Sequence, residues 1–206
     1  TSLSGVPSWM LLLLKNIIAT AGVKNINEIW PDLELYIHGG INFTPYINQF
    51  NSLIPSSKMN YLETYNASEG FFALQDRTNS KEMLLMLDYG IFYEFINKED
   101  LDNKVNNYIS LEDVKKDIDY AMIISTNSGL WRYHIGDIVR FTSTNPYRII
   151  IKGRTKNCIN TFGEELMVYN TDVAIFEACK KTNSKITDYT VAPIYMSDKS
   201  GRHEWA

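Results

Sequence analysis

Strand, helix and strand follow one another between residues 33 and 73, and this order limits the folds open to the chain. The segment Leu33–Ile37 alternates like a strand, Thr44–Leu53 has helical spacing behind a threonine cap, and Tyr61 opens a second apolar strand. Two strands joined through a helix run parallel in one sheet. We therefore predict an α/β layer that contains a parallel pair of strands.

Both strands end on residues that suit ligand binding. The first runs into His38-Gly39-Gly40, and the second runs into a turn that carries Tyr65, Ser68 and Glu69. Parallel sheets bind ligands outside the carboxyl ends of their strands, so we expect both ends to face one crevice. Glu69 offers the anionic oxygen that magnesium prefers, Ser68 a donor and Tyr65 a flat ring. A plain turn is an open alternative at either place.

The pattern changes after residue 80 to short strands separated by turn residues such as Asn127-Ser128-Gly129 and Asn145-Pro146. The expected strands are Met83–Leu87, Ile91–Ile96, Tyr120–Ser125, Tyr133–Thr142 and Tyr147–Ile151. Short strands with turns between them predict an antiparallel sheet or a small barrel.

A polar stretch, Lys152–Asn157, follows the last of these strands and has the composition of a hinge. Beyond it, Asn170–Thr182 has the spacing of an amphipathic helix and Tyr189–Met196 that of a strand. We expect one domain over residues 1–152 and the hinge with the start of a second α/β domain over residues 153–206.

The amino-terminal segment predicts a helix that Ser4 caps, with Pro7 in its first turn and Gly22 as its stop. Apolar residues cover nearly its whole circumference, so we expect it to be buried between layers. The apolar run Trp9–Leu14 is far shorter than the roughly 20 residues of a membrane span.

Composition argues against several classes of partner. The net charge is −4 and both signs are mixed along the chain, so neither a nucleic acid nor a membrane is expected to bind. Cys158 and Cys179 lack CxxC spacing, and the three histidines are scattered. We therefore expect reduced thiols, no structural zinc and a cytoplasmic protein without an obligate protein partner.

Two later stretches can contribute to a nucleotide site. In Gly129–Val139, Gly136 leaves room beside Asp137, whose carboxylate can accept hydrogen bonds from both hydroxyls of a ribose. The other stretch is Lys152-Gly153-Arg154, followed by Gly163-Glu164-Glu165-Leu166. Each alone is also compatible with a β-turn.

The order Tyr-x-x-Ser-Glu, Tyr-x-x-Gly-Asp and Gly-Arg resembles the adenylate-forming enzymes, the superfamily of acyl-CoA synthetases, luciferases and peptide-synthetase adenylation domains. Four segments look most like the GH3 auxin-responsive promoter family of acyl acid amido synthetases, in a bacterial form. They are Gly5–Trp9, Tyr65–Gly70, Leu130–Tyr133 and His203–Trp205. The resemblance spans nearly the whole chain but only the middle of the family's protein, so a phosphate loop should precede Thr1 and most of a small domain should follow Ala206.

The resemblance implies the luciferase-like fold and a role for each matching residue. Tyr65 would stack on adenine, Ser68 would lie near the phosphates, and Glu69 would hold Mg²⁺. Asp137 would bind the ribose hydroxyls and Arg154 the nucleotide. The backbone of Gly39 and Gly40 would line the adenine and acyl pocket, and Lys156 would lie at the hinge between half-reactions. His134 departs from the family, which usually has Arg there; Arg132 would compensate if it turned the same way.

The reaction that the resemblance implies is attack of a carboxylic acid on the α-phosphate of ATP, followed by transfer of the acyl group to an amine. The resemblance implies that this amine belongs to an amino acid. Charge builds on phosphate oxygens, so magnesium and fixed donors are the expected catalysts. Two alternatives stay open: thioester formation with CoA, and a nucleotide-binding module without turnover. His38, the Phe43–Tyr46 segment and the Val6–Met10 turn either wall the acyl pocket or only pack. The 206 residues alone are expected to lack ligase activity.

Overall fold

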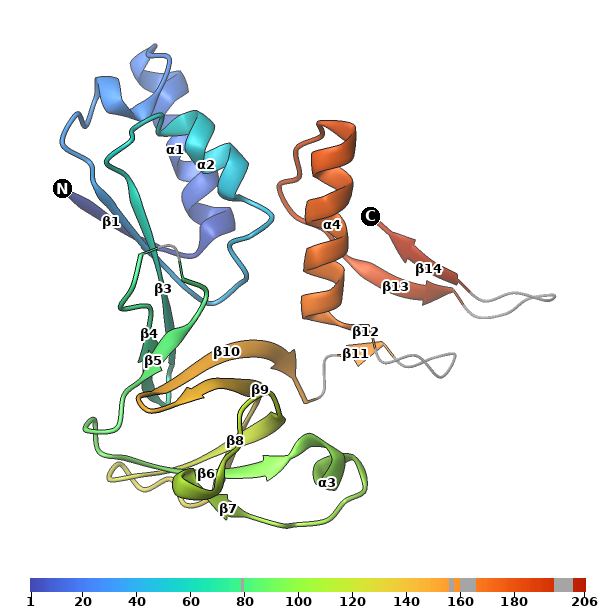
Figure 1. Cartoon of the computed structure of the whole chain (residues 1–206). Coiled ribbons are helices and arrows are strands. Elements are labelled where there is room, and N and C mark those ends of the chain that lie inside the picture. The colour runs from blue at the N-terminus through green and yellow to red at the C-terminus, as the bar shows by residue number, and fades with distance from the viewer. Residues whose placement is uncertain (79, 156–157, 160–165, 195–201) are drawn as a thin grey trace. The chain divides into compact units, whose positions relative to one another are not determined.

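The computed structural model describes residues 1–78, 80–155, 158–159, 166–194 and 202–206 (Figure 1). The chain forms two compact units. The first contains Thr1–Thr64 and Asn170–Ala206, and the second contains Tyr65–Asn160 and Glu165–Tyr169. The domain boundary expected after residue 152 stays a prediction, because these units divide the chain by compactness and not by the family's domains.

Parallel strands form the sheet of the first unit, as the strand and helix order predicted. Strands β1 (Ser2–Gly5), β2 (Leu35–His38) and β3 (Asn60–Ala67) lie in this order, with Ser2 opposite Leu35 and Leu35 opposite Asn60. Helix α1 (Pro7–Ala21) connects β1 toward β2, and α2 (Ile47–Leu53) connects β2 to β3. A one-turn 3₁₀ helix covers Ile26–Glu28.

The core of the first unit joins these helices to the strands. Leu11, Leu14 and Phe50 from the helices are fully buried together with Tyr36 of β2, whose ring stacks on Phe50 at 4.9 Å between centroids. These side chains lie on the faces of the helices and of β2 that pack together. Burial of such apolar faces stabilises α/β layers.

Three expectations about the helices were wrong in detail. Ser4 lies in β1 and does not cap α1, whose N-cap is Val6 without a side-chain hydrogen bond. Trp9 is 80% exposed, so α1 buries one side and not its whole circumference. Helix α2 begins at Ile47 because Phe43–Tyr46 first forms a turn, in which the Asn42 side chain accepts a hydrogen bond from the Thr44 amide at 2.9 Å.

The carboxyl-terminal part of the chain contains a helix and a strand pair. Helix α4 spans Val168–Thr182, and β13 (Val191–Ile194) pairs antiparallel with β14 (Arg202–Trp205). The predicted helix and strand are therefore confirmed. Two short strands, β11 (Cys158–Ile159) and β12 (Leu166–Met167), also pair antiparallel.

An antiparallel sheet forms the second unit, again as predicted. Its strands lie in the order β4-β5-β10-β9-β8-β6-β7. Their bounds are Gly70–Leu74 for β4, Met83–Leu85 for β5, Ile91–Asn97 for β6, Ile109–Ser110 for β7, Asp119–Thr126 for β8, Tyr133–Thr144 for β9 and Tyr147–Arg154 for β10. Helix α3 (Lys98–Asp102) and the 3₁₀ turn Leu111–Asp113 connect them.

Strand β10 continues through Lys152, Gly153 and Arg154, which the sequence analysis assigned to a polar break. Arg154 pairs with Asp137 across the β9–β10 ladder. The break therefore begins later than expected, and Lys156 lies outside the described residues.

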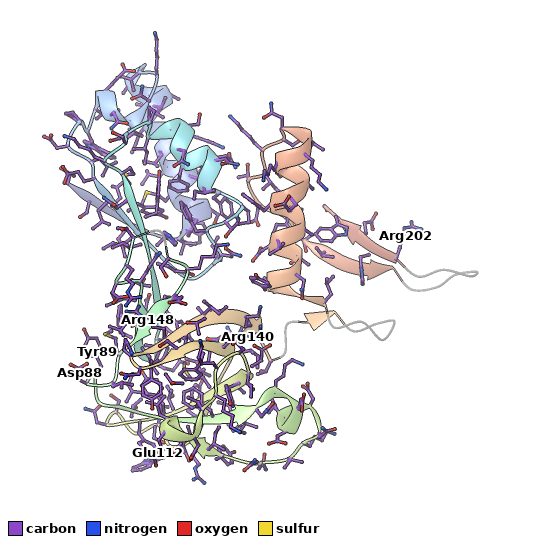
Figure 2. All side chains as sticks on the ribbon, viewed as in Figure 1. Asp88, Tyr89, Glu112, Arg140, Arg148 and Arg202 are labelled. Carbon is purple, nitrogen blue, oxygen red and sulfur yellow. The ribbon has the colours of Figure 1, made fainter. Side chains whose placement is uncertain are left out.

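Two ion pairs join neighbouring segments of this sheet, and their arginines are labelled in Figure 2. The Arg148 side chain is 4% exposed and binds both carboxylate oxygens of Asp76, while Arg140 binds Asp119 in the same two-point manner. The planar guanidinium matches a carboxylate in this geometry. Among the described residues, none of the helices has the length and apolarity to cross a membrane.

Candidate functional site

The turn between β3 and β4 places Ser68 and Glu69 at the tip of a hairpin in the second unit. Ser68 is exposed there, and Glu69 is partly buried. The next residue, Gly70, packs tightly, because a Cβ at this position would lie 2.9 Å from Ile91 Cδ1. A larger residue at position 70 would therefore require the Ile91 side chain to shift.

Asp137 on β9 is the centre of a cluster that brings together residues distant in sequence. The Tyr65 hydroxyl donates to Asp137 Oδ2 at 2.5 Å, and Arg154 Nε lies 3.3 Å from Asp137 Oδ1. Arg154 also donates from a terminal nitrogen to the Ile135 carbonyl at 2.9 Å. The cluster therefore contains three of the residues that the sequence analysis assigned to the nucleotide.

The electrostatics of the cluster follow from burial. Desolvation raises the pKa of Asp137 above its ordinary value, while the Tyr65 hydrogen bond and the Arg154 charge oppose that rise. The negative charge of Glu69 adds to it, which shows that the two carboxylates lie near enough to interact. Burial also raises the pKa of Tyr65, so its phenol keeps its proton and acts as a donor.

Glu69 is held by Tyr133, which belongs to a motif named in the sequence analysis but was given no role there. Tyr133 on β9 donates to Glu69 Oε1 at 3.0 Å, and this hydrogen bond raises the pKa of the tyrosine. Tyr133 is the first residue of the Tyr-x-x-Gly-Asp motif that ends on Asp137, and this motif was the available signal.

The donor set at Glu69 fits a magnesium ion shared with phosphates. Mg²⁺ is commonly bound through one or two carboxylates together with substrate phosphates, not by an all-protein cage. The Tyr133 hydroxyl engages Oε1 of Glu69, and Asp137 supplies a second carboxylate nearby. Among the described residues, no group of three or more His, Cys, Asp and Glu side chains gathers.

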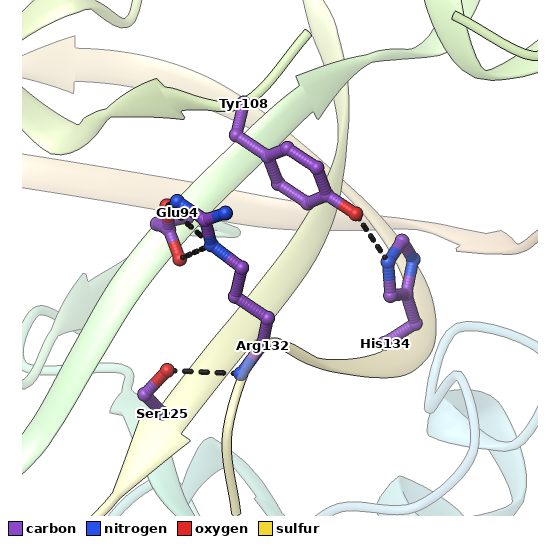
Figure 3. A network of polar contacts seen from close by, with 5 residues as sticks. All are labelled: Glu94, Tyr108, Ser125, Arg132 and His134. Carbon is purple, nitrogen blue, oxygen red and sulfur yellow. Dashed lines mark hydrogen bonds and ion pairs between the residues drawn. The ribbon is translucent and has the colours of Figure 1, made fainter. Parts of the chain in front are cut away.

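Arg132 and His134 both turn toward Tyr108 (Figure 3). The Arg132 guanidinium lies 4.8 Å from the centre of the Tyr108 ring and binds Glu94 through both carboxylate oxygens. His134 Nε2 lies 3.1 Å from the Tyr108 hydroxyl. Arg132 does share the orientation of His134, but Glu94 neutralises its charge, so it does not replace a family arginine as a free cation.

An open groove of about 470 Å³ adjoins the β3–β4 turn within the second unit. Ile91, which Gly70 contacts, forms part of its wall. The remaining wall includes the apolar Leu87, Phe92 and Trp131 and the polar Ser125 and Asn127. Phe92 is 62% exposed and Trp131 is 83% exposed, so the groove presents aromatic faces to solvent.

The remaining predicted site residues are in the first unit or outside the described ranges. Gly39 packs on β3, where a Cβ would lie 2.4 Å from the Thr64 carbonyl oxygen, and Gly40 has φ +83°. Both positions therefore require glycine. These glycines lie in the first unit and Glu69 lies in the second. A crevice shared by the glycines and Glu69 therefore stays a prediction.

Comparison with known proteins points to one family. Residues 84–154 match the GH3 family central domain. Indole-3-acetic acid-amido synthetase GH3.4 of Arabidopsis thaliana is 29% identical over 129 residues, which cover 57% of this chain and 21% of that protein. GH3.3 of the same organism is 23% identical over 124 residues, covering 57% of this chain and 20% of that protein. The chain thus spans about a fifth of these relatives.

Solved structures agree on the fold. The GH3.15 acyl acid amido synthetase in complex with 2,4-DB superposes with a TM-score of 0.70 at 19% identity, covering 87% of this chain and 32% of that one. The 2-hydroxyisobutyryl-CoA ligase in its postadenylation state gives 0.65 at 14% identity, covering 92% and 39%. Both are adenylate-forming enzymes, so the predicted luciferase-like α/β fold is confirmed. Residues 84–154 are thus similar to the central domain of the GH3 family, and the chain is similar in fold to a GH3 acyl acid amido synthetase.

Proposed function

We propose that the protein carrying this chain is an ATP-dependent ligase that activates a carboxylic acid as an acyl adenylate and transfers the acyl group to an amino acid. The observation that carries this proposal is the cluster of Tyr65, Glu69, Asp137 and Arg154 in one unit of a chain that is similar in fold to a GH3 synthetase. A carboxylate, a second carboxylate and a guanidinium are the groups that ribose hydroxyls, a magnesium ion and phosphates require.

In the first step, the carboxylate of the acid attacks the α-phosphorus of ATP, an acyl–oxygen–phosphorus bond forms, and pyrophosphate leaves. Asp137 accepts hydrogen bonds from the ribose and so fixes the position of the α-phosphate, while Arg154 adds positive charge. Glu69, oriented by Tyr133, offers a carboxylate oxygen to the metal. Bound Mg²⁺ neutralises charge on the phosphate oxygens. Ser68 is exposed on the same turn and is assigned to the phosphates.

In the second step, the amine attacks the acyl carbon, AMP leaves, and the amine loses a proton. Positioning supplies much of the rate in such a transfer, because the reactants meet within one site. The groove beside Ile91 has exposed aromatic walls, which favours an acid with an apolar or aromatic body.

The test is pyrophosphate release by the full-length protein with a panel of aromatic and aliphatic carboxylic acids. Each acid is assayed with amino acids and, separately, with CoA as acceptor. The proposal expects release that depends on the acid, and an amide product when amino acids are present. A thioester product with CoA and no amide product would show that the protein acts as an acyl-CoA ligase. ATP binding without release for any acid would indicate a nucleotide-binding module.

A further inference from the structure

Tyr65 is a buried residue of the second unit. It is 6% exposed and lies in the main core cluster, where its ring meets Phe72 at 4.9 Å between centroids and an interplanar angle of 55°. The ring is packed within this cluster. The hydroxyl is the part of Tyr65 that reaches a candidate site residue.

Among the described residues, each oxygen of the Asp137 carboxylate has one partner. Tyr65 donates to Oδ2 at 2.5 Å, and Arg154 approaches Oδ1 with Nε at 3.3 Å. A carboxylate oxygen can accept more than one hydrogen bond, so each oxygen keeps capacity for a ligand hydroxyl. Since both oxygens are engaged, the carboxylate plane is fixed before any ligand arrives.

The backbone around Asp137 is shaped to allow this arrangement. Gly136 has φ +86°, and a Cβ there would lie 3.1 Å from a terminal nitrogen of Arg154. The Gly136 carbonyl accepts a hydrogen bond from the Thr155 amide at 2.8 Å, which ties the end of β10 to β9. Glycine is thus needed both for the backbone conformation and for the close approach of Arg154.

We propose that Tyr65 is a positioning residue for nucleotide recognition: its hydroxyl contributes to binding by holding Asp137 in the orientation that accepts the ribose hydroxyls. This inference rests on the proposed function. It differs from the role that the family resemblance implies, in which the ring contacts adenine, because the two roles depend on different atoms of the same side chain.

The Tyr65→Phe variant separates these roles, since it keeps the ring and removes the hydroxyl. Dissociation constants of ATP and of 2′,3′-dideoxy-ATP are measured with the full-length protein. Wild type should bind ATP more tightly, because only ATP has the hydroxyls that Asp137 accepts. Tyr65→Phe should reduce this preference about tenfold, the equivalent of one hydrogen bond, by weakening ATP alone.

Tyr93→Phe is the matched control. Tyr93 is 4% exposed in the same core cluster, and its hydroxyl donates to the Met86 carbonyl at 3.1 Å. Loss of this hydroxyl should leave the nucleotide preference unchanged. Incorporation of 4-aminophenylalanine at position 65 restores a donor at the same end of the ring, so it should restore the preference for ATP. This variant also tests the inference if Tyr65→Phe fails to fold.

Three outcomes would overturn the inference. They are an unchanged preference in Tyr65→Phe, an equal weakening of both nucleotides, and an equal loss of preference in Tyr93→Phe. Failure of the proposed function has a different signature, because wild type would then bind no ATP or would not distinguish ATP from its dideoxy analogue.

Discussion

At the scale of single residues, Asp137 joins three segments of the second unit. Its contacts reach Tyr65 at the end of β3, Arg154 at the end of β10 and, through the electrostatic field, Glu69 in the turn. The motif spacing predicted these residues as parts of one site. It did not predict that Tyr65 would be buried, because exposure depends on how the whole sheet packs and not on the local pattern.

Replacing Asp137 with Ala should weaken ATP binding by the full-length protein at least about 100-fold. The ribose hydroxyls would lose a charged acceptor, and such bonds contribute about 1.5–3 kcal/mol each. Asp102→Ala, which removes a carboxylate of α3 from an exposed ion pair, serves as the control. Wild-type affinity in Asp137→Ala would reassign Asp137 to a purely structural role.

His38 and Glu63 form a register pair on β2 and β3, and burial shifts their pKa values in opposite directions. Burial lowers the pKa of His38 from 6.5 to about 4 and raises the pKa of Glu63 from 4.5 to about 7. The neutral His38 stabilises the fold above pH 6.5, and this contribution is lost as the pH falls toward 4. The protonated Glu63 stabilises it below pH 4.5, and this contribution is lost as the pH rises toward 7.

The two contributions should largely cancel in wild type, and single variants should separate them. In His38→Leu, the free energy of unfolding should fall by about 3 kcal/mol as the pH rises across the Glu63 window, whereas in Glu63→Gln it should rise by a similar amount across the His38 window. Urea denaturation of the 206-residue chain at several pH values measures both. Identical pH profiles for the two variants would contradict this assignment.

At the scale of elements, the sequence pattern was most informative where residues alternate along strands. The strands of the second unit lie where the pattern placed them, with ends shifted by a few residues. Strand β1 was missed, because its four residues contain too few apolar positions to show a period. The start of α2 was misplaced because the Asn42 side chain stabilises a turn where a threonine cap was expected.

The Arg148–Asp76 pair should be the ion pair that matters most to the sheet. Asp76→Ala leaves the guanidinium, which is 4% exposed, without its partner. Removing one member of a buried pair costs about 3–5 kcal/mol. Asp102→Ala removes an exposed i,i+4 partner of Lys98 and should cost less than about 0.5 kcal/mol. Equal urea midpoints for the two variants would show that Arg148 finds other partners.

At the scale of the whole molecule, the chain spans about a third of the length of the GH3.15 structure that it matches. The resemblance to the GH3 family was accessible from motif order, and the α/β class was accessible from the order of strands and helix. A crevice shared by Gly39 and Glu69 stays a prediction, because these residues belong to separate units. Motif spacing along a chain cannot fix how two compact bodies meet.

Lys156 belongs to this scale, because the family resemblance places it at the hinge between half-reactions. Proline fixes φ, so Lys156→Pro in the full-length protein should hinder rotation of one domain on the other. We expect acid-dependent ATP–pyrophosphate exchange to be largely retained while the amide product is lost. Equal loss of both steps in a folded variant would remove Lys156 from the hinge.

The most direct test of the proposed ligase is ATP–pyrophosphate exchange by the full-length protein, with and without the carboxylic acid panel, in wild type and in Asp137→Asn. This reaction reports formation of the acyl adenylate before any acceptor is needed. We predict exchange that requires both an acid and Mg²⁺ and that falls at least tenfold in Asp137→Asn at subsaturating ATP, because the ribose loses its charged acceptor. Exchange that is independent of acid, or equal in wild type and Asp137→Asn, would contradict the proposed adenylation site.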